Sequence, residues 1–123
     1  MRFIVLLALA GVVGTLARYG LQHFLQPPGG TFPWGTLAVN ISGSFLMGFL
    51  ATYLLRGGEA SPELRAVLAV GFCGAFTTMS SFSYEIVALT SNRQYWSAGW
   101  YLVTTIAGSC AAIVAGMTVG LRR

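Results

Sequence analysis

The stretch Gly71-Phe-Cys-Gly-Ala-Phe-Thr-Thr-Met-Ser-Ser-Phe-Ser83 places two glycines and a cluster of hydroxyl side chains inside an otherwise apolar segment. A helix that crosses lipid keeps its backbone groups hydrogen-bonded, so a polar interruption is tolerated only where protein or a water-filled cavity surrounds it. Interruptions of this kind release carbonyl and amide groups that can bind ions. The stretch therefore predicts a broken transmembrane helix with a role in ion handling.

The composition is that of a membrane protein. The 123 residues are 55% hydrophobic and only 8% charged, whereas soluble domains carry about 25% charged residues. The net charge is +4, and every cationic side chain is an arginine. These arginines do not form the charged stripe of a nucleic-acid-binding domain. We expect them to lie beside anionic membrane lipid, which is a predicted partner.

Four apolar segments are each long enough to cross a bilayer, which takes about 20 helical residues. They are residues 3–25, 34–55, 64–89 and 96–121, within a single domain, 1–123. Turn-forming and charged residues separate them. The first segment is too long for a signal peptide and contains Arg18, so we interpret it as a retained helix. The fold class expected is an all-α membrane protein with four transmembrane helices, the third of them broken.

Polar side chains recur every four residues in two of these segments, so each set lies along one helix face. The sets are Thr36, Asn40 and Ser44 in the second segment, and Tyr101, Thr105 and Ser109 in the fourth. Hydroxyl groups can bond to their own helix backbone, but the amide of Asn40 is costly in hydrocarbon unless it is paired. Beside a broken helix, the two stripes favour an ion path or a polar interface.

Small residues form another stripe in the fourth segment, at Gly108, Ala112, Gly116 and Gly120. Such a stripe permits close helix packing, either within the chain or between subunits. Four helices enclose little room, so a conduction path is expected to need more than one copy. Cys73 and Cys110 show no metal or disulfide spacing, and we interpret both as small buried apolar residues.

Carboxylates are nearly absent from the apolar segments, where Glu85 is the only acid. It has no histidine or aspartate relay beside it, and whether it is charged stays open. The chain shows no nucleophile–base pair or metal-ligand set, so we do not expect an enzyme. Hydroxyls, an amide, Arg18 and freed backbone groups suit an anion that accepts hydrogen bonds.

Two segments resemble the signature segments of the Fluc (CrcB-type) fluoride channels. They are Gly35-Thr-Leu-Ala-Val-Asn-Ile-Ser-Gly-Ser-Phe45 and the Gly71–Ser83 stretch, and Gly14-Thr-Leu-Ala-Arg-Tyr19 resembles a third. The resemblance covers essentially the whole chain. It implies a passive, fluoride-specific channel in the bacterial inner membrane that lowers cytoplasmic fluoride. It also implies an antiparallel, dual-topology homodimer with two pores and a central structural sodium ion.

The resemblance implies roles for individual residues. Backbone carbonyls of Gly74 and Thr77 from both subunits would hold the sodium ion, which as a hard cation prefers oxygen ligands. The implied ion path contains Thr36, Asn40, Phe82, Tyr101, Thr105 and Ser109, with Arg18 near its wide aqueous mouth. The chain departs from the family at Met79, where a phenylalanine is expected. A phenyl ring presents a positive edge to an anion and a thioether does not, so conduction or selectivity could differ there.

The arginines favour one orientation in the membrane. If the segments alternate, Arg2, Arg56, Arg65, Arg122 and Arg123 fall on one side and only Arg93 on the other. This distribution predicts cytoplasmic termini, and it does not support the dual topology that the resemblance implies.

Two alternatives to a channel stay open. A small four-helix multidrug or cation exporter would need a carboxylate deep in an early helix, and the first segment has none. A non-transporting membrane assembly subunit would use the polar stripes only to hold helices together.

Overall fold

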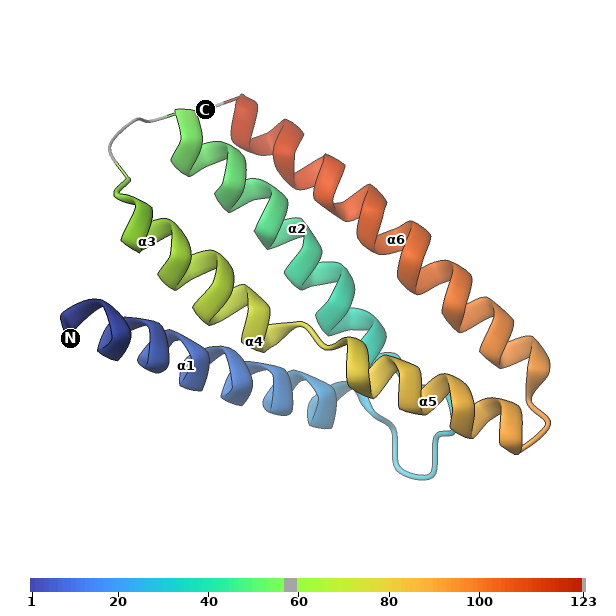
Figure 1. Cartoon of the computed structure of the whole chain (residues 1–123). Coiled ribbons are helices and arrows are strands. Elements are labelled where there is room, and N and C mark those ends of the chain that lie inside the picture. The colour runs from blue at the N-terminus through green and yellow to red at the C-terminus, as the bar shows by residue number, and fades with distance from the viewer. Residues whose placement is uncertain (57–59, 123) are drawn as a thin grey trace.

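The computed structural model describes residues 1–56 and 60–122 and contains only helices in them. In chain order these are α1 (Arg2–Leu25), α2 (Trp34–Arg56), α3 (Pro62–Ala66), η1 (Val67–Cys73), α4 (Gly74–Phe76), α5 (Met79–Ser91) and α6 (Tyr95–Leu121) (Figure 1). Four helical stretches are long and apolar enough to cross a membrane, and the third runs from Pro62 to Ser91. The four predicted transmembrane helices are therefore confirmed.

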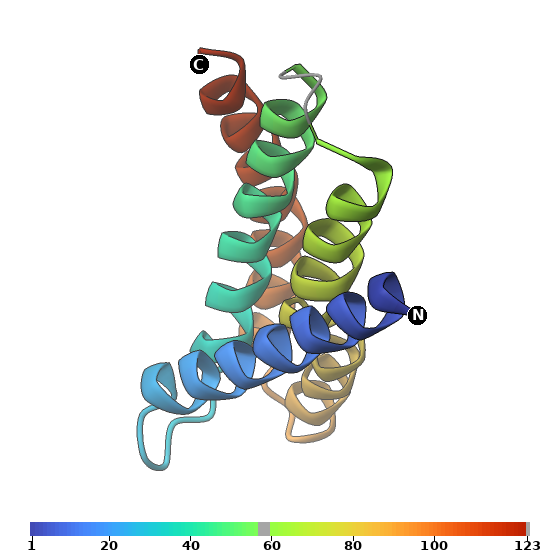
Figure 2. The same ribbon diagram turned by 90° about the vertical axis from the view of Figure 1, so that its left-hand side faces the viewer.

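The stretches alternate in direction. The start of α1, the start of α3 and the end of α6 lie toward one end of the molecule, and the α1–α2 and α5–α6 connections lie toward the other (Figure 1). The second view shows α1 crossing the other helices obliquely (Figure 2). Arg2 and Arg122 therefore lie toward one end and Arg93 toward the other.

The small-residue stripe of α6 packs against α2 of the same chain. A Cβ atom on Gly116 would collide with the carbonyl oxygen of Phe45, and one on Gly120 would lie 3.0 Å from the carbonyl oxygen of Phe49. Gly48 of α2 meets the backbone of Ile113 in the same way. Close backbone approach of this kind is how membrane helices associate without a hydrophobic driving force. The stripe is thus used within the chain, and the alternative of an intersubunit stripe is not needed.

The third crossing is broken at two residues only. Thr77 (φ −82°, ψ 158°) and Thr78 (φ −149°, ψ 118°) are extended, while both glycines of the quoted stretch lie in helical turns. Gly71 serves packing, since a Cβ atom there would lie 2.9 Å from the Ala10 methyl group of α1. The broken third helix is confirmed, but the glycines do not make the break.

The turns before and after the break differ. Ahead of it, η1 is a π-helix, and the Gly74 amide bonds to the Ala69 carbonyl five residues back. After it, α5 starts with Thr78 as its N-cap, whose side-chain oxygen accepts a hydrogen bond from the Ser81 amide at 3.2 Å. A threonine cap satisfies one of the free amides of a helix start. The helix therefore begins again directly after Thr78.

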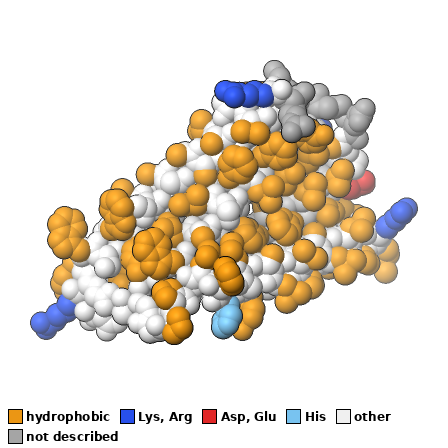
Figure 3. Space-filling model, turned by 180° about the vertical axis from the view of Figure 1, so that it is seen from behind, with side chains coloured by type: hydrophobic (Ala, Val, Ile, Leu, Met, Phe, Trp, Pro, Cys, Tyr) orange, Lys and Arg blue, Asp and Glu red, His pale blue; other side chains and the backbone are white. Residues whose placement is uncertain are grey.

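Hydrophobic side chains are spread over the face of the molecule shown in Figure 3. Phe24 is 84% exposed, Trp96 92% and Val70 67%. Surfaces of this extent belong against lipid or another protein chain. Cys73 is buried as expected, but Cys110 is exposed, because its side of α6 is not covered by α2. The expectation that both cysteines are buried was wrong for Cys110.

Candidate functional site

Asn40 braces the break in the third crossing. Its Nδ2 donates to the Thr78 carbonyl at 3.0 Å, and the Thr78 amide donates to its Oδ1 at 2.8 Å. In an unbroken helix this amide would bond to the Gly74 carbonyl, so a side chain of α2 replaces a backbone partner. The pairing satisfies a buried amide side chain in an apolar segment. An Asn side chain carries two N–H groups, so the second can serve another acceptor.

A carboxylate lies one turn further along the same helices. Thr36 donates to Oε1 of Glu85 at 2.8 Å, and the Tyr101 hydroxyl donates to Oε2 at 2.6 Å. Gln22 of α1 in turn donates to the Thr36 oxygen at 2.9 Å. The chain of bonds joins α1, α2, α5 and α6, and we call these four side chains the Glu85 network.

The network shows how two expected path residues are bonded and adds two residues to the site. Thr36 and Tyr101 were expected to donate to an anion; in the structure each donates its hydroxyl hydrogen bond to Glu85, and their part in an ion path stays a prediction. Sequence reasoning assigned no part to Gln22 and left Glu85 open. The sequence did contain a reason to include Glu85 in the site, because a lone carboxylate in an apolar segment requires nearby donors. Gln22 sits at the end of a segment and carried no comparable signal.

Phe82 and Met79 lie in different surroundings although both belong to the first turn of α5. The Phe82 ring is 3% exposed and meets the buried Tyr101 ring edge-on, with centroids 5.0 Å apart and planes at 67°. Met79 is 71% exposed. Within one chain, therefore, the aromatic position is internal and the methionine position faces outward.

A recess of about 310 Å³ gathers most of the expected path residues. We call it the Asn40 recess; among its lining residues are Asn40, Ser44, Thr77, Thr78, Met79, Phe82, Thr105, Ser109 and Cys110. Thr36, Tyr101 and Arg18 do not line it. The lining is a mixture of hydroxyls, an amide, backbone and apolar groups without a carboxylate, and its hydroxyl and amide hydrogens can be donated to an anion.

Thr105 is the most informative residue of this recess. The residue is 6% exposed, and its Oγ1 atom is buried with no hydrogen-bond partner among the described residues. Buried hydroxyls are nearly always paired, so each exception calls for an explanation. A hydroxyl that lines a recess and has no protein partner is suited to donate to a species that enters the recess.

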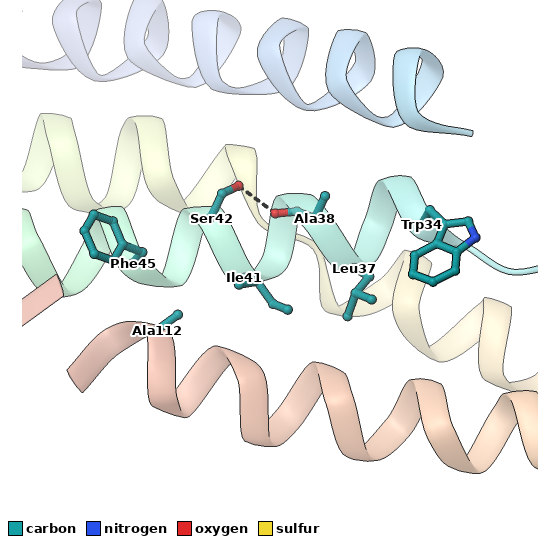
Figure 4. A pocket seen from close by; sticks show the side chains of 7 residues that line it. All are labelled: Trp34, Leu37, Ala38, Ile41, Ser42, Phe45 and Ala112. Carbon is teal, nitrogen blue, oxygen red and sulfur yellow. Dashed lines mark hydrogen bonds between the residues drawn. The ribbon is translucent and has the colours of Figure 1, made fainter. Parts of the chain in front are cut away.

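A second recess contrasts with the first. It measures about 520 Å³ and lies between α2 and α6 (Figure 4). Its lining residues are Trp34, Leu37, Ala38, Ile41, Ser42, Phe45 and Ala112. The one hydroxyl among them, on Ser42, donates to the Ala38 carbonyl at 2.6 Å. This groove is lined mainly by apolar side chains, and its one hydroxyl is already bonded within its own helix.

Arg18 contacts one of the two expected sodium ligands at the break. The Arg18 guanidinium donates to the Thr77 carbonyl at 3.4 Å, a long contact. Gly74 is exposed and Thr77 is partly exposed. Arg18 was expected near an aqueous mouth; the structure places its guanidinium beside the break.

Comparisons with known proteins match nearly the whole chain to one family. Residues 5–117 match the family model described as CrcB-like protein, Camphor Resistance (CrcB). A protein of Rhizobium meliloti (strain 1021) named "Fluoride-specific ion channel FluC" is 42% identical over 121 residues, covering 97% of this chain and 96% of the relative. A protein of the same name from Chlorobium phaeobacteroides (strain BS1) is 41% identical, covering 93% of this chain and 89% of the relative.

Replacing Asn40 tests the brace. Asn40→Asp keeps an acceptor for the Thr78 amide but loses the donor to the Thr78 carbonyl, and it buries a carboxylate. We expect the free energy of unfolding to fall by at least about 1–3 kcal/mol. Thermal or denaturant unfolding in detergent measures this change. Ser44→Ala, in the same recess, is the control and should change stability by less than about 0.5 kcal/mol. Equal stability of both variants would contradict the brace.

Proposed function

Because the chain belongs to the CrcB family, we propose that it is a fluoride-specific channel through which fluoride leaves the cytoplasm passively. It is a multi-pass protein of the bacterial plasma membrane, and its family is a class of ion channels rather than of enzymes. The observation that carries the proposal is the buried, unpaired Thr105 hydroxyl in a recess that Asn40 also lines.

The recess offers donors of the kind that fluoride requires. Fluoride is small and strongly hydrated, so it enters a narrow site only if protein donors replace its water. Thr105, Ser109 and the second N–H group of Asn40 supply such donors. The Phe82 ring adds a partly positive edge. Chloride is larger, so the same donors would surround it less closely.

The Glu85 network forms the next layer of the proposed path. Thr36 is one helical turn from Asn40, and Tyr101 is one turn from Thr105. Their hydroxyls donate to the ion only when they release the Glu85 carboxylate. The carboxylate and the anion thus compete for the same protons, which permits several moderate binding steps instead of one tight site.

The antiparallel homodimer is supported by the position of the Asn40 recess. Met79, Ile106 and Cys110 are exposed along its border, so in a single chain the recess would open onto hydrocarbon. A second copy would cover this border and separate the polar groups from lipid. A two-fold interface uses the same surface of both copies, so two equivalent paths would result. The arginine distribution favours a single orientation and is the opposing observation.

The proposed sodium ion fits the chemistry of the break. Two carbonyls, of Gly74 and Thr77, stand at the break, and a two-fold pair of chains would supply four oxygen ligands. The contact from Arg18 to the Thr77 carbonyl is long, and a carbonyl oxygen has a second lone pair. When bound, sodium would supply a fixed positive charge near the anion path, where low polarity strengthens its effect.

Transport by the purified protein tests the main proposal. Liposomes containing the chain are expected to release fluoride, measured with a fluoride electrode, and to retain chloride. Thr105→Val removes one donor to the ion and should lower fluoride efflux by about 10-fold, since a hydrogen bond to a charge contributes about 1.5–3 kcal/mol. Thr104→Val is the matched control, because the Thr104 hydroxyl donates to the Trp100 carbonyl at 2.7 Å.

Other outcomes would count against this proposal. Vesicles that stay closed to fluoride would favour the assembly subunit, and drug-dependent proton flux would favour the exporter. Equal loss of efflux in both threonine variants would show that the recess does not provide the path.

Labelling tests the antiparallel arrangement. On a background with both native cysteines replaced, single cysteines at Gly29 and at Ala60 mark the two ends of the molecule. In intact cells, an impermeant thiol reagent should label about half of each variant if the chain inserts both ways. Labelling of one position only would remove dual topology, and with it the antiparallel dimer.

Removal of sodium tests the cation site. Fluoride efflux should fall when a large organic cation replaces sodium on both sides of the membrane, and it should recover on return of sodium. The efflux rate of the wild-type protein is measured with the fluoride electrode in each salt. An unchanged rate after prolonged sodium-free dialysis would contradict a required sodium ion.

A further inference from the structure

The end of α1 lies directly against the start of α2. A Cβ atom on Gly35 would lie 2.6 Å from the Gln22 carbonyl oxygen and 2.7 Å from the Gln22 Cα atom, so only glycine permits this approach. Thr36 is the next residue of α2, and the Gln22 side-chain nitrogen lies 2.9 Å from its hydroxyl oxygen. The contact between the two backbones therefore fixes the distance that the Gln22 side chain spans to reach Thr36.

The Thr36 hydroxyl stands between two partners and has only one proton to give. The residue is buried, and its hydroxyl donates to Oε1 of Glu85 at 2.8 Å. With that proton engaged, the Thr36 oxygen can only accept from Gln22, so the amide nitrogen of Gln22 and not its amide oxygen faces Thr36. The hydrogen bonds thus run in one direction, from the Gln22 N–H group through Thr36 to Glu85.

This direction matters for a hydroxyl that is proposed to bind an anion. Hydrogen bonds in a chain polarise one another, by about 10–30% per bond, so a hydroxyl that accepts from an amide donates more strongly. The Gln22 N–H group also occupies a lone pair of the Thr36 oxygen that would otherwise repel an anion. An anion that displaced the Glu85 carboxylate would meet the same polarised proton.

Gln22 exerts this effect from outside the Asn40 recess. The residues that line the recess come from α2, the break, α5 and α6. Among the described residues, the Gln22 side chain has one hydrogen-bond partner, which is Thr36. Any influence of the Gln22 amide on the proposed path is therefore expected to pass through the Thr36 hydroxyl.

We propose that Gln22 is a positioning residue of the fluoride path, which directs and strengthens the Thr36 hydroxyl as a donor. The inference rests on the proposed function, in which Thr36 belongs to the path. In this role Gln22 acts through Thr36 and does not touch the ion. Removal of its donor should therefore slow fluoride only in a chain that retains the Thr36 hydroxyl.

Gln26, one helical turn after Gln22, provides a matched control. Its side-chain nitrogen donates to the Gly30 carbonyl at 3.0 Å and to the Phe32 carbonyl at 3.1 Å, both in the α1–α2 connection. Gln26→Met therefore removes an amide of the same kind from the same end of α1 and leaves the bonds of the Glu85 network in place. Both copies of a homodimer carry each change, so the comparison does not depend on how the copies are oriented.

Two replacements of Gln22 separate donation from side-chain size and polarity. Gln22→Met keeps the length of the side chain and removes its donor. Gln22→Asn keeps an amide that is one carbon too short to reach Thr36. Each is made alone and together with Thr36→Val, which removes the hydroxyl. Initial fluoride efflux from liposomes is measured with a fluoride electrode, and thermal unfolding in detergent checks that each variant is folded.

We expect either Gln22 variant to lower fluoride efflux about two-fold, since the Thr36 hydroxyl becomes a weaker donor. Thr36→Val alone should lower efflux by about 10-fold, as the loss of a hydrogen bond to a charge. In the Thr36→Val background the Gln22 variants should cause no further loss, because changes that act through one another are not additive. Any effect of Gln26→Met should be the same with and without the Thr36 hydroxyl.

Three results would each overturn the inference. The first is a wild-type rate in either Gln22 variant. The second is a loss of the same size in the Thr36→Val background, which would show that Gln22 acts independently of Thr36. The third is a Thr36→Val chain as fast as wild type. Wild-type protein that carries no fluoride would refute the proposed function itself, whereas normal wild-type flux with any of these results refutes only the role of Gln22.

Discussion

The pairing of the Asn40 side chain with both backbone groups of Thr78 is the interaction on which the rest of the site depends. Within a bilayer, each unpaired backbone group costs several kcal/mol, so a helix can be interrupted only where a partner is supplied. Asn40 provides both a donor and an acceptor from one planar group. The pairing also links α2 to the start of α5, which positions Phe82 beside Tyr101 and turns the Thr77 carbonyl toward Arg18.

The two polar layers differ in how they are satisfied. In the Glu85 network every hydroxyl proton is engaged by the carboxylate or its partners. In the Asn40 recess the Thr105 hydroxyl has no partner among the described residues. In the proposed path, a donor that the protein leaves free, next to donors bonded to an internal carboxylate, would give an anion a graded sequence of sites. Glu85 would be tolerated near such a path because it accepts hydrogen bonds from the same groups that the anion would use.

Packing explains why these polar groups reach one another. Glycines let α2 and α6 approach to backbone contact, so the polar stripes on the two helices face the same space beside α5. The same close approach leaves α1 and the outer side of α6 exposed. A chain of this size buries little of its own apolar surface, and its polar recess lies at its border. Lipid and a second copy of the chain would cover the apolar surface and the open border of the Asn40 recess, which one chain leaves exposed.

The sequence by itself determined the number of crossings, their approximate bounds and the presence of a polar break, because hydropathy and length are local properties of the chain. It also indicated that Asn40 and Ser44 share one helix face and that Thr105 and Ser109 share another, since four-residue spacing fixes a helix face. It placed the break within the Gly71–Ser83 stretch but did not identify the two residues that make it, because a glycine can serve close packing as readily as it can end a helix. Only the tertiary structure decided that Asn40 bonds to Thr78, that Glu85 accepts hydrogen bonds from Thr36 and Tyr101, and that Met79 faces outward. These outcomes depend on how helices distant in the chain are rotated and paired, and no local pattern encodes that choice.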